Sequence, residues 1–160
     1  EDNAAARLAA TALHPSVRIA SPSTGRVNIH AEADGLFVVD RHTIDAINRV
    51  DPSITIATLA EFAPVACGQM VATVKIIPFA VPVEKLDAAI AAAKSASPLL
   101  KVAPWFSKPV GLVATELPSL KPEVMDKTAR ILQARLARSG SILMKEVRVP
   151  HDEDAVGNAI

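Results

Sequence analysis

A strand–helix–strand pattern in the last third of the chain restricts the fold more than any other feature. Apolar runs over residues 110–114 and 142–149 flank a helix pattern over residues 122–138, which Ser139-Gly140 ends as a C-cap glycine does. Such a unit specifies two parallel strands joined by a right-handed crossover. Because one unit cannot bury both faces of its sheet, we expect it to be part of a larger α/β domain.

The residues before this unit predict a mixed domain rich in strands. Alternation over residues 27–33, then Asp34-Gly35 and an apolar run over 36–39, predicts a β-hairpin. Asp40 is expected to cap the next helix. The run over 69–77 is nearly continuous in β-branched residues, which is typical of a strand covered on both faces. Further elements are an Ala-rich helix over 3–13, a strand over 54–59 and a helix from Pro82 to about Lys94.

Three prolines, Pro98, Pro104 and Pro109, mark a domain boundary. We therefore expect an N-terminal helical segment (1–14), a β-rich mixed domain (15–106) and a truncated α/β domain (107–160). The fold class is α+β followed by α/β. The chain begins at Glu1 without a Met, and it stops at Ile160 just after a helix-start pattern, so we expect a fragment of a longer protein.

Composition excludes several classes of partner. Half of the 160 residues are hydrophobic but only 3% are aromatic, so the core must be aliphatic and platforms for stacking bases are scarce. Seventeen basic and seventeen acidic residues balance, which argues against nucleic acid and acidic membranes. No apolar run reaches the ~20 residues of a membrane helix. A lone cysteine, Cys67, indicates a reducing compartment, and we expect a cytoplasmic protein.

Two patterns could carry chemistry. Asn28, His30, Glu32 and Asp34 alternate along one strand, so they share a face that could ligate a metal, although a solvated face explains them better. Lys75 within an apolar strand is interpreted as a lysine that reaches solvent, and Cys67 as an ordinary small residue in a turn.

The second pattern lies where residues 115–120 leave the carboxyl end of an α/β strand, which is where ligands of such sheets bind. Asp126-Lys127-Thr128 lies in the first turns of the following helix, where it could hold a polar ligand or magnesium, and a solvated first turn explains it equally well.

These residues resemble the opening half of the molybdopterin-binding domain of molybdenum-cofactor biosynthesis proteins, which is a doubly wound α/β domain. Thr115-Glu116-Leu117 stands where that family ends a strand in Thr-Gly-Asp-Glu-Leu. Asp126-Lys127-Thr128 stands where the family has Asp-Ser/Thr-Asn on the following helix. Val149-Pro150-His151-Asp152 stands where a second strand of the family leads to an Asp. Residues 34–40 and 66–78 look like the segment that precedes this domain in a divergent bacterial subgroup.

The resemblance implies a pterin ligand, molybdopterin, with its phosphate at the carboxyl ends of the sheet, and magnesium as a further ligand. The implied binding residues are Thr115, Glu116, Asp126, Lys127, Thr128 and Asp152, with Asp126 placing magnesium or phosphate. The Gly after Thr115 is missing, and the family's Gly-Gly-Thr/Ser-Gly loop that contacts the phosphate would lie beyond Ile160. The fragment should therefore bind weakly and be inactive by itself, whereas the parent would be a biosynthetic transferase.

Two other functions remain open. The chain could be a non-catalytic scaffold or dimerisation module that forms a homo-oligomer, because an incomplete sheet edge invites pairing with another chain. It could also be a metal-dependent hydrolase that uses His30, Glu32 and Asp34.

Overall fold

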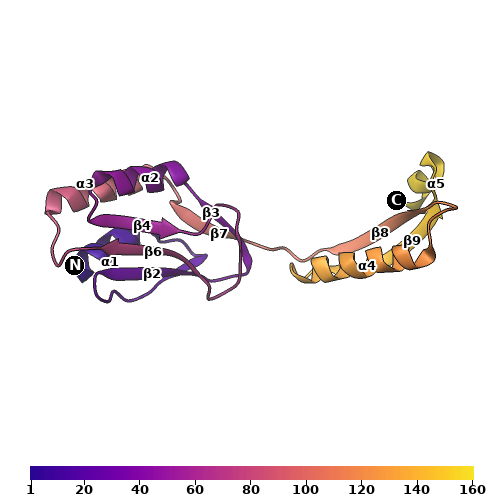
Figure 1. The fold of residues 1–160 in the computed structure, drawn as a ribbon, viewed down its shortest axis with the longest axis horizontal. Helices are drawn as coiled ribbons and strands as arrows, with labels where there is room; N and C mark the ends of the chain where they lie inside the picture. The colour runs from indigo at the N-terminus through magenta and orange to yellow at the C-terminus, as the bar shows by residue number, and fades with distance from the viewer. The chain divides into compact units, whose positions relative to one another are not determined.

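The computed structural model describes all residues, Glu1–Ile160, and the chain divides into two compact units. Unit 1 is Glu1–Pro104 and unit 2 is Trp105–Ile160. Both contain helices and strands, so the class is mixed α and β (Figure 1). None of the helices combines the length and the apolar character needed to cross a bilayer.

Unit 1 contains two antiparallel sheets and three α-helices. The first sheet has the order β1-β2-β6-β4 and the second has the order β5-β3-β7. In chain order the elements are α1 (Asp2–Ala9), a 3-10 turn (Ala10–Ala12), β1 (Val17–Ile19), β2 (Arg26–Ala31), β3 (Gly35–Val39), α2 (Arg41–Val50), β4 (Ile54–Thr58), β5 (Pro64–Val65), β6 (Met70–Ile76), α3 (Val83–Ala93) and β7 (Leu100–Pro104).

The helices of unit 1 cover the first sheet. Helices α2 and α3 lie side by side, and α2 also contacts β4 (Figure 1). Helix α1 contacts β2, β6 and α3, and its Leu8 is fully buried, so the N-terminal helix is part of this unit. The core is aliphatic apart from Phe37, as the composition predicts. Asp40 caps α2 as expected, because its carboxylate accepts a hydrogen bond of 2.9 Å from the Thr43 N–H.

The hairpin predicted around Asp34-Gly35 is wrong. Strand β2 pairs with β1 and β6, whereas β3 pairs with β5 and β7. Gly35 does not adopt the positive φ of a two-residue hairpin turn. It is glycine because β7 passes so close that a Cβ atom would lie 2.1 Å from the Ala103 carbonyl oxygen. The Asp34 carboxylate accepts a hydrogen bond of 2.7 Å from the Cys67 N–H instead of forming a turn to β3.

The strand predicted over residues 69–77 is covered on both faces only near its start. In β6, Ala72, Val74 and Ile76 are buried on one face, whereas on the other face Val71 is buried, Thr73 is half-buried and Lys75 is exposed. Lys75 reaches solvent, as interpreted from the sequence. The β-branched residues of β6 therefore reflect the strand itself, since such side chains are favoured on any pleated sheet.

Unit 2 is the predicted strand–helix–strand arrangement. Its elements are β8 (Pro109–Glu116), α4 (Pro122–Ala137), β9 (Ile142–Pro150) and α5 (Glu153–Ala159). The pairing of β8 with β9 is parallel, as expected, and runs from Pro109 opposite Ile142 to Glu116 opposite Pro150. Met125 is the only buried apolar side chain in this unit. The other apolar side chains of unit 2 are half-buried or exposed.

Candidate ligand-binding site

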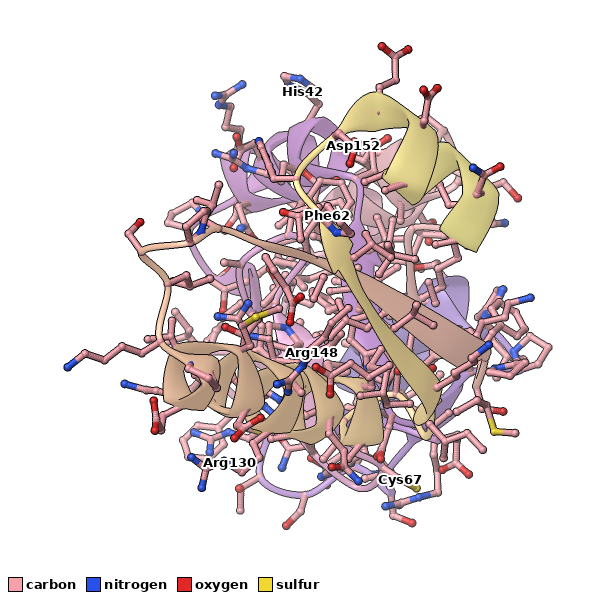
Figure 2. All side chains as sticks on the ribbon, turned by 90° about the vertical axis from the view of Figure 1, so that its right-hand side faces the viewer. His42, Phe62, Cys67, Arg130, Arg148 and Asp152 are labelled. Atoms are coloured by element: carbon pink, nitrogen blue, oxygen red, sulfur yellow. The ribbon has the colours of Figure 1, made fainter.

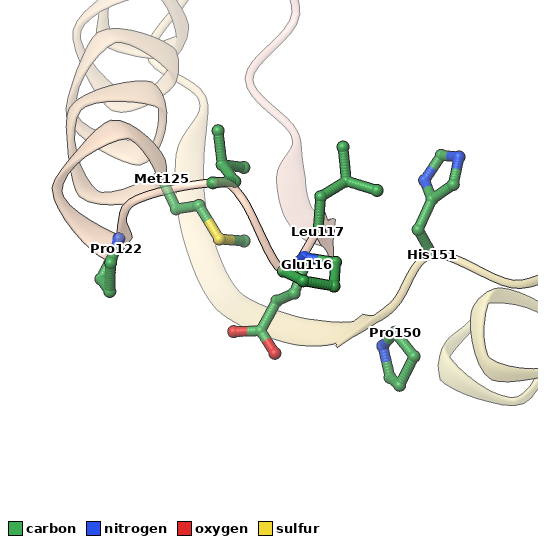
Figure 3. Close-up of a pocket in the computed structure, with 8 residues that line it drawn as sticks. Glu116, Leu117, Pro122, Met125, Pro150 and His151 are labelled. Atoms are coloured by element: carbon green, nitrogen blue, oxygen red, sulfur yellow. The ribbon is translucent and has the colours of Figure 1, made fainter.

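The carboxyl ends of β8 and β9 meet at one edge of the parallel sheet. Glu116 and Pro150 are paired there, and α4 begins nearby at Pro122. The chain leaves β8 through a short proline-containing turn, which leaves an open hollow of about 530 Å³ over the strand ends (Figure 3). This hollow lies where ligands of open α/β sheets bind. Its lining residues are Glu116, Leu117, Pro118, Leu120, Pro122, Met125, Pro150 and His151.

The lining of this hollow is mostly apolar and contains no lysine or arginine. Its polar side chains are Glu116 and His151. Figure 3 shows the Glu116 carboxylate projecting to one side of the strand ends, while Leu117 and His151 project to the other. A ligand in this hollow would therefore meet apolar walls and a carboxylate acceptor.

A second, smaller hollow of about 320 Å³ adjoins the start of α5. It is lined by Thr115, His151, Asp152, Glu153 and Val156 and also lacks lysine and arginine. Asp152 is the N-cap of α5, where its carboxylate accepts a hydrogen bond of 2.8 Å from the Ala155 N–H. The rim of both hollows is thus acidic apart from His151.

Thr115 and His151 form a hydrogen bond of 2.9 Å between the Thr115 Oγ1 and His151 Nδ1 atoms. This bond connects the ends of the two parallel strands and holds the imidazole between the two hollows. His151 was not among the residues predicted to bind ligand. The signal was nevertheless present, since parallel pairing brings the residues that follow both strands to the same edge.

Asp126 does not face either hollow, because it forms an ion pair with Arg148 of β9. The Arg148 guanidinium lies 2.5 Å from the Asp126 carboxylate and 2.6 Å from that of Glu146. Hydrogen bonds to Glu146 and then to Asp126 hold the pKa of Arg148 well above its ordinary value. Figure 2 shows Arg148 beside α4, apart from Asp152 at the start of α5. This network connects α4 to β9.

The other two residues predicted on α4 also lie outside the hollows. Lys127 is exposed, and the Thr128 hydroxyl donates a hydrogen bond of 2.9 Å to the Val124 carbonyl within the helix. Of the six predicted binding residues, Thr115, Glu116 and Asp152 therefore lie at the strand ends, whereas Asp126, Lys127 and Thr128 do not.

The four polar residues expected to share one strand face are not on one strand, because β2 ends at Ala31 and Glu32 and Asp34 follow it. Glu32 forms an ion pair of 3.2 Å with Arg18, and Asp34 bonds to the Cys67 backbone. The Nδ1 atom of His30 is buried without a hydrogen-bond partner. Nowhere in the chain do three His, Cys, Asp or Glu side chains gather in a way that could hold a metal ion.

Comparison of the chain with known protein families, with curated proteins and with solved structures found no match in any of the three.

Proposed function

We propose that unit 2 is the opening strand–helix–strand unit of a molybdopterin-binding domain, and that the pterin binds over the carboxyl ends of β8 and β9. The hollow between these strand ends and the start of α4 is the observation that carries the proposal. The hollow lies at the carboxyl ends of parallel strands and is lined by apolar residues and two polar side chains, as is usual for small-molecule sites. The protein would then act in molybdenum-cofactor biosynthesis.

The accompanying magnesium does not fit the residues in this structure. The Asp126 carboxylate is occupied by the Arg148 guanidinium, a cation that repels a second cation, and Asp126 belongs to no group of three His, Cys, Asp or Glu side chains that could hold a metal ion. No step through magnesium follows from this arrangement. Asp126 instead has the structural task of holding α4 against β9.

The two strands of unit 2 would contact only one side of the ligand. Each of its two strands has a single hydrogen-bonded neighbour, and the hollow is open on one side. A doubly wound domain surrounds its ligand with loops from several strands. We therefore expect weak binding by this chain.

Titration calorimetry of the chain with molybdopterin tests the proposal. We expect weak but saturable binding, reduced by about tenfold or more in Leu117→Asp, because that change places a charge in the apolar wall of the hollow. Leu13→Asp is the control, since Leu13 is an exposed leucine of unit 1, at 74% exposure against 46% for Leu117. Absence of any binding by the unmodified chain, or an equal effect of the two variants, would contradict the proposal.

A second function is favoured by a separate observation on unit 2. Ile142 and Met144 of β9 are 57% and 65% exposed, and both strands have an unpaired edge. Such edges and apolar side chains are typical of surfaces that pair with another chain. A scaffold or dimerisation module predicts self-association that Met144→Lys weakens, as measured by light scattering. A strictly monomeric chain at high concentration would exclude it.

A further inference from the structure

We infer that the outer edge of β8 is an interface, at which a second copy of this chain adds its own β8 as an antiparallel strand. The inference goes beyond ligand binding. It rests on the second proposed function, self-association, for which it names the strand and the register. It follows from a difference between β8 and the other outer strands of the structure.

The outer strands of unit 1 each have a feature that opposes further pairing. The Asn48 side chain bonds to both backbone groups of Ile56 at the centre of β4. The Ser16 hydroxyl accepts a hydrogen bond of 2.8 Å from the Val102 N–H of β7. Strand β5 has two residues, one of which is Pro64, and β1 has only three residues. Short strands, prolines and covering groups are the usual protection of sheet edges.

In unit 2, β9 is protected in a similar way. Its pairing with β8 skips Met144, which therefore forms a β-bulge. Lys145 is exposed, and Arg148 forms an ion pair of 2.6 Å with Glu146. Bulges and charged side chains along an edge oppose the addition of a further strand.

Strand β8 has none of these protecting features. It is eight residues long, and residues 110–115 include no charged residue and no proline. Strand β9 is its only hydrogen-bonded neighbour, and no loop or side chain bonds to the backbone on its other edge. The outer edge of β8 is thus a row of unpaired backbone donors and acceptors, which is a template for another strand.

The hydrogen bonds at the start of β8 identify the residues that face this outer edge. The Lys108 carbonyl accepts a hydrogen bond of 3.1 Å from the Ile142 N–H, so Lys108 directs its backbone groups towards β9. The direction alternates from one residue of a strand to the next. Gly111, Val113 and Thr115 therefore direct their N–H and C=O groups away from β9.

These three residues allow β8 to pair with itself about a two-fold axis at Val113. Val113 then lies opposite Val113 of the second copy, and Gly111 lies opposite Thr115. Each of their outward N–H groups donates to a carbonyl of the other copy, and no like charges face each other along the paired residues. Two-fold symmetric, self-complementary interfaces are the commonest kind in homo-oligomers.

Charge variants of the whole chain test this register by analytical ultracentrifugation. We expect the unmodified chain to form a dimer whose population rises with concentration. Val113→Lys and Val113→Glu should each weaken the dimer by at least about tenfold, because each variant places like charges opposite each other at the two-fold axis. An equimolar mixture of the two variants should recover the dimer, since opposite charges then meet. Circular dichroism measures whether each variant is folded.

Val147→Lys is the matched control. Val147 is also a half-buried valine and pairs with Val113 within the sheet, but it belongs to β9. This variant should dimerise like the unmodified chain. Hydrogen exchange followed by NMR adds a second readout. The Val113 N–H should exchange at least about tenfold more slowly in the dimer than in dilute solution, whereas the Leu112 N–H, which faces β9, should change little.

The inference and the proposed functions fail separately. A chain that stays monomeric at high concentration would overturn both the β8 interface and self-association, and it would leave the molybdopterin proposal unaffected. A dimer that Met144→Lys weakens but the Val113 variants do not would retain self-association and overturn the β8 interface. Failure of the mixture to recover the dimer, or an equal loss in Val147→Lys, would also overturn it.

Discussion

The Asn48 side chain satisfies the hydrogen-bonding groups of the backbone at an exposed strand edge. Its amide donates a hydrogen bond of 2.9 Å to the Ile56 carbonyl and accepts one of 2.7 Å from the Ile56 N–H. Strand β4 is the outer strand of its sheet, so both backbone groups of Ile56 would otherwise be available to another chain. The amide of Asn48 thus replaces a neighbouring strand at the centre of β4.

We predict that Asn48→Ala lowers the free energy of unfolding of unit 1 by about 1–3 kcal/mol, because two backbone groups lose their partners. Chemical denaturation followed by circular dichroism measures this. Asn3→Ala is the control, since Asn3 is exposed on α1 and its replacement should change stability little. Equal stability of the two variants would show that water satisfies Ile56 equally well.

Asp51, which follows the end of α2, makes the stability of unit 1 depend on acidic pH. Its carboxylate accepts hydrogen bonds from the Ser53 hydroxyl at 2.5 Å and from the Ser53 N–H at 3.0 Å. The Ser53 hydroxyl first, then the Ser53 N–H, and to a smaller extent Lys85 lower the pKa of Asp51 below its ordinary value of 3.8. A depressed pKa means that the folded state favours the ionised form.

The stabilisation from Asp51 is therefore complete above its ordinary pKa of 3.8, and it is lost as the pH falls through the lower pKa of the folded state. We predict that Ser53→Ala destabilises unit 1 at about pH 7, and that the difference from the unmodified chain narrows towards about pH 3. Urea midpoints over this range measure it, with Ser21→Ala as an exposed control. A difference independent of pH would contradict the role of the ionised carboxylate.

At the scale of elements, local patterns predicted most of the helices and strands, but not β5 and β7, and not which strands pair. The Asp40 cap, the proline at the start of α4 and the glycine that follows α4 are short-range signals, and all three act as expected. The parallel pairing of β8 with β9 was predictable because a helix of this length leaves little alternative. By contrast, the sequence around Asp34-Gly35 predicted a hairpin, but the strands on either side of it do not pair with each other.

The hairpin prediction failed because residue 35 must be glycine for a reason that lies far away in the sequence. The backbone of β7 approaches β3 at Ala103, and nothing near residue 35 in the sequence announces this approach. For the same reason, the candidate site was only partly predictable. The strand ends were located correctly, but the partner of Asp126, which is Arg148, depends on how α4 packs on β9.

We predict that Gly35→Ala destabilises unit 1 by at least about 1–3 kcal/mol, because the new methyl group overlaps the Ala103 carbonyl and the strands must separate. Gly111→Ala in β8 is the control, since an added Cβ there meets nothing within 4 Å. Thermal unfolding of both variants measures the difference. A fully stable Gly35→Ala variant would mean that β7 can move away without loss of packing.

At the scale of the whole molecule, the two units differ in how many apolar side chains they bury. The hydrophobic core cluster lies entirely within unit 1, whereas unit 2 buries one apolar side chain, Met125. Because burial of apolar surface is the dominant stabilising contribution, unit 2 must be the less stable part of the chain.

We predict that backbone amides of β8 and β9 exchange with deuterium at least about tenfold faster than those of β2 and β6. Mass spectrometry of peptic fragments measures this for each strand separately. Addition of molybdopterin, the ligand of the proposed function, should slow exchange near Glu116, while β2 and β6 remain unchanged. Uniform protection throughout the chain would contradict the difference between the units.

The pairing of β3 with β7 has a consequence for how the chain acquires its fold. Gly35 pairs with Pro104, so the second sheet of unit 1 closes only when the two ends of a long intervening segment meet. Folds governed by such distant contacts form slowly, since the loop-closure entropy is lost before the contacts compensate for it. Until then Phe37 and its apolar neighbours stay accessible to water and to other chains. During synthesis on the ribosome, this interval is when these apolar side chains are open to aggregation.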